Sequence, residues 1–247
     1  YAVSNNLGLK EFGFGGQGGK SASGQARFVL LLNPDTVLPP SALSDMLCFM
    51  EEHAKAGVAG PRLVRADGSL DRACRRSFPT PEVAAYRFSG LGRLFPNSPR
   101  FGRYNLTHLS PDLTTEVDSV VGAFMLIRGQ ALHEVGLLDE QFFMYAEDLD
   151  LCYRIKQCGW QVWYNSAVTV LHYKGQSSRQ RAKFANVKFY ETMRLFHDKH
   201  FKEQSPRLVN WLIYAGVGLM GGWALLRDRL RPEQERGVAS ALPVRSE

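Results

Sequence analysis

An acidic stretch near the middle of this 247-residue sequence is the first candidate for chemistry. Glu147, Asp148 and Asp150 lie where an irregular, aromatic segment gives way to a helical pattern that ends at Gly159. A helix N-terminus favours ionised carboxylates because of its free N–H groups and its dipole. A carboxylate held ionised at the edge of a ligand site can accept a proton, so all three residues are candidate general bases. Ordinary capping of a helix explains them equally well.

A second acidic element, Asn33 and Asp35, follows the apolar run 28–32. The run predicts a short strand buried on both faces of a parallel sheet, and Pro34 prevents its continuation. The polar residues therefore fall beyond the carboxyl end of a strand, where open α/β sheets bind ligands. Asp35, with Asn33 beside it, suits a divalent cation held against a diphosphate. Taken alone, a polar turn is the simpler explanation.

Two further positions belong with these elements. The β-branched run 168–171 places His172 at a strand end, where a structural hydrogen bond is the commoner role and metal ligation the alternative. A strand expected over 117–128 is interrupted at Gly122. We interpret Gly122 and Ala123 as a point where the backbone approaches a ligand closely, although a bulge explains a glycine there too.

Taken in order, five motifs resemble the family 2 glycosyltransferases of the GT-A fold, particularly the rhamnosyltransferase-like branch. The matching residues are 32–36, 121–128, 136–154, 159–160, and His172 with Gly175 and Ser177. The resemblance implies a Rossmann-like α/β domain with a mixed, mainly parallel sheet flanked by helices. It also implies that four residues contact the sugar donor: Asn33, Asp35, Gly122 and Ala123. Asp35 and His172 would in addition hold Mg²⁺ or Mn²⁺. Asp148 would be the base.

The function implied is inverting transfer of a sugar, with rhamnose as one candidate, from a nucleoside diphosphate to a glycan or polyprenyl-linked acceptor in cell-surface polysaccharide synthesis. Family members begin with a strand and loop that hold the nucleotide base, whereas residues 2–6 here already resemble the entry to the glycine-rich segment that follows. We therefore expect that first unit to be missing. The alternatives are a non-catalytic remnant or membrane-anchored binding module, and a nucleotidyltransferase-like enzyme.

Composition narrows the class of partner. The net charge of +6 and pI near 9.2 suit anionic ligands. Nucleic acid is not expected, because the sequence has neither a dense Lys/Arg stripe with interleaved aromatics nor a known reader motif. Four scattered cysteines predict reduced thiols rather than a disulfide framework.

The remaining pattern predicts the supporting elements. We expect a helix over 41–55 with Leu43, Met46, Leu47 and Met50 on its inner face, and a hairpin turn at Asp67 and Gly68. A long connection is expected over 77–116, strands over 161–164 and 168–171, and a basic amphipathic helix over 184–201. Three arginines before the connection are expected to form a solvated charge run: Arg72, Arg75 and Arg76.

The C-terminal region has a different character. Residues 208–226 carry no charge and are long enough to cross a membrane. Arg207 precedes them and Arg227, Arg229 and Arg231 follow. We therefore expect a glycosyltransferase domain at 1–205, an apolar membrane-associating helix with basic flanks at 206–231, and a polar tail at 232–247. Because nucleotide sugars are cytosolic, the expected location is the cytoplasmic face of the plasma membrane, with spanning and in-plane insertion both open.

Overall fold

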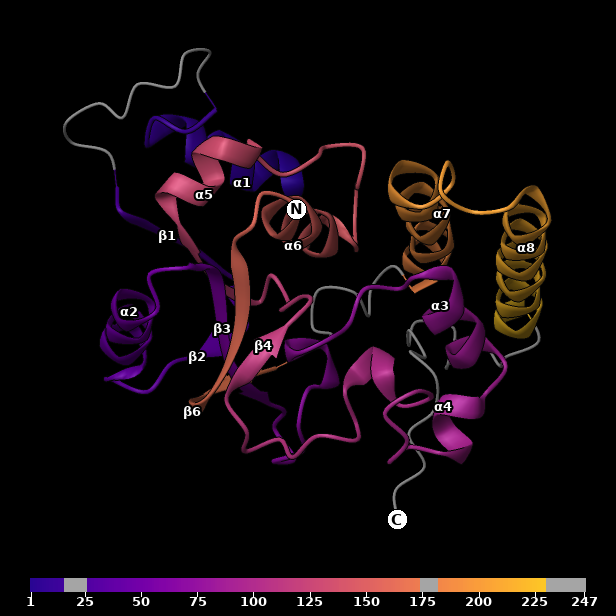
Figure 1. Ribbon diagram of the computed structural model, residues 1–247, viewed down its shortest axis with the longest axis horizontal. Helices are drawn as coiled ribbons and strands as arrows, with labels where there is room; N and C mark the ends of the chain where they lie inside the picture. The colour runs from indigo at the N-terminus through magenta and orange to yellow at the C-terminus, as the bar shows by residue number, and fades with distance from the viewer. Residues whose placement is uncertain (16–25, 174–181, 230–247) are drawn as a thin grey trace. The chain divides into compact units, whose positions relative to one another are not determined.

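The computed structural model describes residues 1–15, 26–173 and 182–229 (Figure 1). Most of the glycine-rich segment, together with Gly175 and Ser177, lies outside the described residues. The chain forms two compact units, the first made of residues 1–141 and 147–173 and the second of residues 142–146 and 174–247. The boundaries expected at 205 and 231 stay predictions. By internal contacts, the helix before residue 205 belongs with the apolar helix that follows it.

The first unit is an α/β fold, as expected. Its strands are β1 (Phe28–Leu32), β2 (Thr36–Val37), β3 (Ala56–Val64), β4 (Thr115–Val117), β5 (Phe124–Arg128) and β6 (Gln161–His172). Its helices are α1 (Ala2–Glu11), α2 (Ala42–Glu52), α3 (Pro81–Phe88), α4 (Leu91–Leu94), α5 (Gly129–Val135) and α6 (Glu147–Gln157). Two short 3₁₀ turns, Arg72–Cys74 and Arg103–Asn105, complete it.

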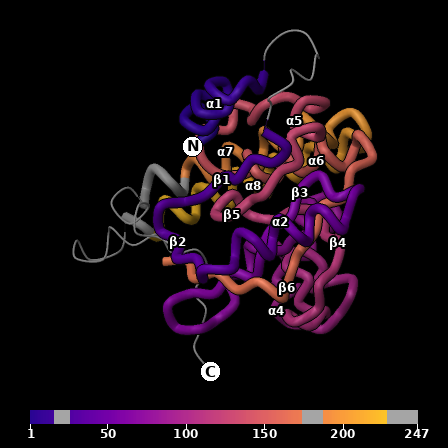
Figure 2. Tube along the Cα trace, turned by 90° about the vertical axis from the view of Figure 1, so that its left-hand side faces the viewer, coloured from indigo at the N-terminus to yellow at the C-terminus, as the bar shows by residue number. Residues whose placement is uncertain are grey.

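The described strands form one mixed sheet in the order β1-β5-β3-β6-β2, with β4 pairing to β6. Strands β1, β3 and β6 share one direction, because β5 lies antiparallel between β1 and β3 while β3 and β6 pair in parallel. Figure 2 shows β1 running beside β5. The sheet brings the end of β1, the start of β5 and the end of β6 toward one edge, where the candidate site residues lie.

Three strand predictions need correction. Strand β1 has the predicted bounds, but among the described residues it pairs only with β5, and Leu32 at its end is exposed. It is therefore an edge strand rather than one buried on both faces. The strand expected over 117–128 is two strands that pair with different neighbours, and the segment between β4 and β5 runs alongside residue 76 instead. The two runs expected over 161–171 are one continuous strand, β6.

Helices α2 and α6 pack on the sheet from opposite sides. Phe49 of α2 meets the ring of Trp163 on β6, whereas a Cβ at Gly57 of β3 would collide with Ile155 of α6. The predicted helix at 41–55 ends at Glu52, and its buried face differs from the prediction, because Leu43 is exposed and Phe49 is buried. A one-residue error in phase moves a side chain about 100° around the helix.

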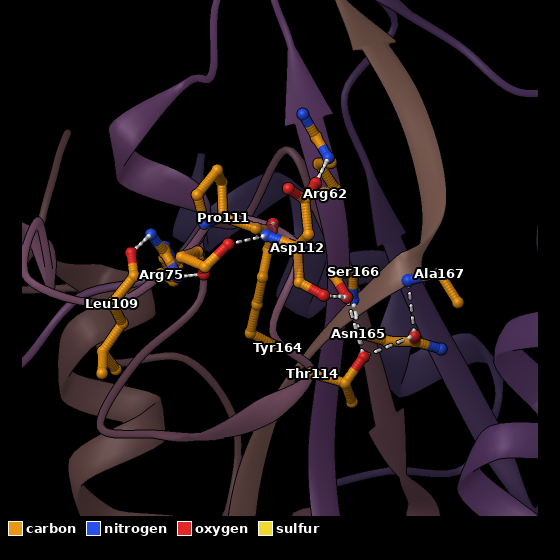
Figure 3. A network of polar contacts seen from close by, with 11 residues as sticks. Arg62, Arg75, Leu109, Pro111, Asp112, Thr114, Tyr164, Asn165, Ser166 and Ala167 are labelled. Carbon is orange, nitrogen blue, oxygen red and sulfur yellow. Dashed lines mark hydrogen bonds and ion pairs between the residues drawn. The ribbon is translucent and has the colours of Figure 1, made fainter.

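A bulge in β6 interrupts its ladder with β3. Pro61 lies opposite Asn165, but Arg62 lies opposite Thr169, so residues 166–168 have no partner in this ladder. Proline cannot donate a ladder hydrogen bond, and bulges are where strands tolerate it. The bulge N–H groups are satisfied elsewhere, since Ser166 donates to Thr114 Oγ1 at 3.1 Å and Ala167 to Asn165 Oδ1 at 3.0 Å (Figure 3).

The same polar network fixes the long connection to the sheet (Figure 3). Arg75 donates to the carbonyls of Ser110 and Leu109 at 2.7 and 2.8 Å, and Tyr164 Oη donates to Pro111 O at 2.7 Å. The connection also contains α3 and α4, so it is not a structureless loop. Arg75 and Arg76 are buried, which makes the predicted solvated charge run wrong for both, while Arg72 is exposed. The predicted turn at Gly68 is confirmed, with φ of +78°.

The second unit is centred on a helical hairpin. Helices α7 (Ala182–His200) and α8 (Arg207–Arg229) pack against each other, which confirms the two helical predictions. The segment Arg207–Arg227 is long and apolar enough to cross a membrane, and none of its most apolar window is buried.

Candidate active site

The acidic stretch forms the first turn of α6, as the sequence predicted. Tyr145 and Ala146, immediately before the helix, have φ of +72° and +64°. Such values are costly for residues with a Cβ and concentrate at functional sites. The turn directs Glu147 and Asp148 into the interior of the first unit, where their exposed fractions are 8% and 5%.

Asp148 is held by three donors. Its Oδ2 accepts from the Arg76 guanidinium at 2.7 Å and from the Gly122 N–H at 3.2 Å, and its Oδ1 accepts from the Leu149 N–H at 2.7 Å. Arg76 is itself fixed by a bond to Val120 O at 3.0 Å. Burial acts to lower the pKa of Arg76, but the facing Asp148 carboxylate outweighs it and the pKa is raised. The pair is therefore a buried ion pair with the carboxylate oriented beside Gly122.

Glu147 has the opposite environment. Its Oε2 is buried and has no hydrogen-bond partner in the described part of the chain. Burial, followed by the nearby Asp148 charge, raises the pKa of Glu147 to about 8. The two neighbouring carboxylates thus differ in environment: Asp148 is paired with Arg76, whereas burial outweighs the nearby positive charges at Glu147.

Asp150 lies in a third environment, away from these donors. It is fully buried, and its Oδ2 accepts from Arg154 Nε at 2.9 Å. Arg154 also donates to the carbonyls of Val135 and Leu137 at 2.6 and 2.8 Å. Asp150 therefore anchors the arginine that joins α6 to the end of α5.

Asp35 and His172 come together, as predicted from two distant segments. Thr36 of β2 pairs with His172 of β6, which leaves the Asp35 Oδ1 atom 3.4 Å from His172 Nε2. The other ring nitrogen, Nδ1, is 3.1 Å from Oδ2 of the fully buried Asp71. A carboxylate on Nδ1 fixes the orientation of a histidine and leaves Nε2 for a ligand, the usual support of a metal-binding histidine.

These residues fit a divalent cation. Asp35 Oδ1 is buried and has no hydrogen-bond partner among the described residues, so it is an acceptor in need of a donor or an ion. Two ligand atoms bound to one small cation lie roughly 3.0–3.4 Å apart at ligand distances of about 2.1 Å. The described residues hold no group of three or more metal-binding side chains. Asp35 and His172 would thus supply two ligands, and Mg²⁺ usually takes most of its other ligands from phosphate oxygens and water.

The backbone links the two clusters. The Asn33 N–H donates to Ala123 O at 2.9 Å, and Gly122, the residue before, donates to Asp148. The close approach of a ligand at Gly122 stays a prediction, and the group that lies close to Gly122 in the structure is the Tyr1 side chain. A Cβ there would lie 2.6 Å from Tyr1 Oη, which donates to Gly122 O at 2.6 Å.

Sequence reasoning missed two of the supporting residues. Asp71 follows the predicted hairpin turn and has no sequence signal of its own, yet it orients His172 across 101 positions of sequence. Arg76 was assigned to solvent, although its neighbours Cys74, Ser77 and Phe78 suggest a buried strand-like segment. An arginine within such a segment needs an internal anion, and that signal points to the acidic stretch.

Comparison with known proteins identifies the family. Residues 12–187 match the model of the family described as glycosyltransferase like family 2. The chain is 30% identical over 210 residues to an N-acetylglucosaminyl-diphospho-decaprenol L-rhamnosyltransferase of Mycobacterium tuberculosis, covering 85% of this chain and 67% of the relative. It is 29% identical over 153 residues to the rhamnosyltransferase WbbL of Escherichia coli K12, covering 62% of this chain and 54% of the relative. A hexosyltransferase of low-salt glycan biosynthesis from Haloferax volcanii is 26% identical over 144 residues, covering 58% and 41%.

The mixed sheet flanked by helices is consistent with the GT-A fold, and the family match defines the class of protein as a glycosyltransferase. The chain belongs to glycosyltransferase family 2 and is similar to its rhamnosyltransferases. It is a glycosyltransferase of polysaccharide synthesis, which sets aside the nucleotidyltransferase alternative.

Proposed function

We propose that this chain transfers rhamnose, with inversion, from its nucleoside diphosphate, with dTDP-rhamnose as the first candidate, to a polyprenyl-linked glycan. The acceptor class is taken from the Mycobacterium tuberculosis relative, which is named for an N-acetylglucosaminyl-diphospho-decaprenol substrate. We further propose that the reaction takes place at the cytoplasmic face of the plasma membrane, where a lipid-linked acceptor and a cytosolic donor meet. The product would serve cell-surface polysaccharide synthesis.

One observation carries this proposal. Along one edge of the sheet, the Asp35–His172 pair and the Asp148–Arg76 pair are joined by the Asn33–Ala123 backbone contact. A cation site and an oriented carboxylate are the two groups that transfer from a diphosphate to a hydroxyl requires. The first neutralises the leaving group, and the second removes the proton of the nucleophile.

In the proposed step, the acceptor hydroxyl oxygen bonds to the anomeric carbon of the donor sugar while the bond from that carbon to the diphosphate oxygen breaks. Attack from the face opposite the diphosphate inverts the anomeric centre. The Asp148 carboxylate takes the hydroxyl proton, and the nucleoside diphosphate leaves with the bonding electron pair. Gly122 and Arg76 orient Asp148 for this transfer, because both donate to its Oδ2.

The contacts of Asp148 leave room for one more donor. A carboxylate has about four acceptor sites, and three donors contact Asp148, so one site remains for the acceptor hydroxyl. We assign proton removal to Asp148 on this basis, with Glu147 as the alternative base and Asp150 as a positioning residue.

Asp35 and His172 would hold the divalent cation, with Asn33 and the Gly122–Ala123 backbone beside the donor. When bound, Mg²⁺ or Mn²⁺ supplies positive charge to the developing diphosphate. Asp71 orients His172 for this role.

The test measures release of nucleoside diphosphate from dTDP-rhamnose with a short-chain N-acetylglucosaminyl-diphospho-prenol as acceptor, in the presence of Mn²⁺. The same assay is repeated with UDP- and GDP-sugars. We expect release that depends on acceptor and is greatest with the rhamnose donor. A chain that neither binds UDP, dTDP or GDP nor releases any of them is a non-catalytic remnant. Release with another sugar would correct the donor but keep the reaction.

A further inference from the structure

The outer face of α8 is an uninterrupted apolar surface. Six large side chains with exposed fractions between 46% and 76% lie on it: Leu208, Trp211, Leu212, Leu219, Trp223 and Leu226. Their spacings of three, four and seven residues place them on one side of the helix. A helix of 23 residues is about 34 Å long. The six side chains are spread along most of it, so they form a continuous apolar patch rather than single exposed residues.

The opposite face of α8 is fastened to α7 by polar contacts. Tyr214 Oη donates to Asp198 Oδ1 at 2.5 Å, and Asn210 Oδ1 lies 2.7 Å from His197 Nε2. Further along, Gly221 lies against the ring of Tyr190. These contacts fix which face of α8 is turned away from α7, so the apolar surface cannot be hidden by rotating the helix without breaking them.

Helix α7 carries charges along its length, and this decides between the two ways of inserting α8. Charged residues on α7 include Lys188, Glu191, Arg194, Asp198 and Lys199. If α8 crossed a bilayer with the hairpin intact, α7 would carry those charges into hydrocarbon, which is costly. If α8 crossed alone, Tyr214 and Asn210 would lose their partners on α7.

We propose that the α7–α8 hairpin docks on an anionic lipid bilayer with α8 lying in the plane of the interface and its outer face in the acyl boundary. Basic residues frame this face, since Arg207 begins the helix and Arg227 lies near its end. Anionic headgroups complement that charge, and an in-plane helix keeps both arginines on the same side of the membrane. Trp211 and Trp223 occupy the interfacial depth that tryptophan prefers.

This docking rests on the proposed function only in that a lipid-linked acceptor places the reaction at a membrane. The hairpin lies wholly in the second unit, whereas the candidate catalytic residues lie in the first. Binding to vesicles and transfer to a short-chain acceptor are therefore separate measurements.

The first experiment is vesicle flotation of the full chain with phosphatidylcholine alone and with added phosphatidylglycerol. We expect binding that strengthens with the anionic lipid and weakens with salt. Leu219→Gln with Trp223→Gln should reduce the bound fraction at least tenfold. Leu94→Gln, a matched leucine that is 70% exposed on α4, should behave as the parent chain. Arg207→Gln should lower the preference for anionic lipid, whereas Arg72→Gln should not.

The second experiment measures insertion depth with spin labels at positions 208, 219 and 226, after Cys48→Ser and Cys158→Ser remove the exposed native thiols. An in-plane helix gives three equal, shallow depths. A label at 219 much deeper than those at 208 and 226 would overturn the proposal in favour of a span. Failure of the full chain to float with the vesicles would overturn the docking proposal. If the Leu219/Trp223 variant still floats but the parent chain is a dimer and the variant is not, the apolar face binds a second protein chain instead. Transfer to the short-chain acceptor without flotation would overturn docking and keep the function.

Discussion

At the scale of single residues, the acidic stretch shows how one short motif supplies three different environments. Asp148 faces a guanidinium and a backbone N–H, Glu147 is buried with an unpartnered oxygen, and Asp150 anchors Arg154. Helical geometry separates Asp148 from the other two, because residues one and two apart on a helix point in different directions. Three carboxylates in one short motif therefore have three different sets of partners.

The environment of Glu147 predicts a pH-dependent stability. The pKa of Glu147 is raised in the fold to about 8. The contribution of its neutral form to stability is therefore fully present at a pH below the ordinary pKa of a glutamate, and it is lost as the pH rises through about 8. Glu147→Gln should therefore match the parent at pH 5 and melt a few degrees higher at pH 9. Thermal denaturation at both pH values measures this. Glu52→Gln, at an exposed glutamate, should change neither value, and an equal gain at both pH values would contradict the account.

The Asp35–His172 pair predicts metal-dependent donor binding. Asp35→Ala removes a hard oxygen ligand and should weaken nucleotide binding in Mn²⁺ by more than ~10-fold, with His172→Ala acting in the same direction but less strongly. Asp71→Asn keeps both ligands but weakens the contact that orients the His172 ring. Loss of a partner that orients a metal ligand typically costs ~10–100-fold in metal affinity. Titration calorimetry with dTDP across a Mn²⁺ series measures each effect. Unchanged affinity in the Asp35 variant, relative to the exposed-residue control Asp45→Ala, would remove Asp35 from the cation site.

At the scale of elements, the predicted bounds agree with the structure where the periodic pattern is long or where a capping residue or a glycine marks its end. The α6 start, the Gly68 turn, α7 and α8 all follow predicted bounds closely, because caps, glycines and uncharged runs act locally. Strand β1 has the right limits but the wrong neighbours, since a five-residue apolar run does not encode which strand pairs with it. The break between β4 and β5 likewise depends on tertiary pairing with residues near 76.

The supporting residues of the site were predictable to a lesser degree. Asp35 and His172 were placed in one site because the family resemblance implies that both hold the cation. Asp71 and Arg76 carry no comparable local mark, and their roles come from contacts over 101 and 72 positions. Charge alone assigned Arg76 to solvent, whereas its burial follows from the apolar neighbours on either side.

The Arg154 bridge predicts a stability effect without a catalytic one. Arg154→Met leaves Asp150 without that cation and frees two carbonyls at the end of α5 and beyond. Removing one partner of a buried pair typically costs about 3–5 kcal/mol, and partial exposure of Arg154 favours the lower value. Adding Asp150→Asn should recover part of the loss. Urea denaturation of both variants measures the difference, and a double variant no more stable than Arg154→Met would show that the carboxylate charge does not set the cost.

At the scale of the whole molecule, catalysis and membrane contact are assigned to different units. Asp35, Asp148 and His172 all belong to the first unit, while the apolar surface of α8 belongs to the second. Under the proposed function and docking, the hairpin would hold the enzyme at the membrane without contributing a reacting group.

This division predicts the behaviour of a shortened chain. A chain ending at Ser205 lacks α8, so it should lose vesicle flotation while binding dTDP with Mn²⁺ within about threefold of the full chain. Helix α7 loses the Tyr214 and Asn210 contacts, which should lower its helical content more than that of the first unit. Calorimetry and hydrogen exchange measure the two effects. Loss of nucleotide binding in a chain whose first unit remains protected from exchange would show that α8 contributes to the donor site.

The most direct test of the central assignment compares Asp148→Asn with Glu147→Gln in the transfer assay. A general base acts in the transition state, so its loss lowers kcat with little effect on donor binding. We expect Asp148→Asn to reduce kcat by ~10²–10⁴-fold, with dTDP affinity unchanged, and Glu147→Gln to reduce kcat by less than about tenfold. Transfer by Asp148→Asn within a few-fold of the parent, with a large loss in Glu147→Gln, would contradict the account and make Glu147 the base.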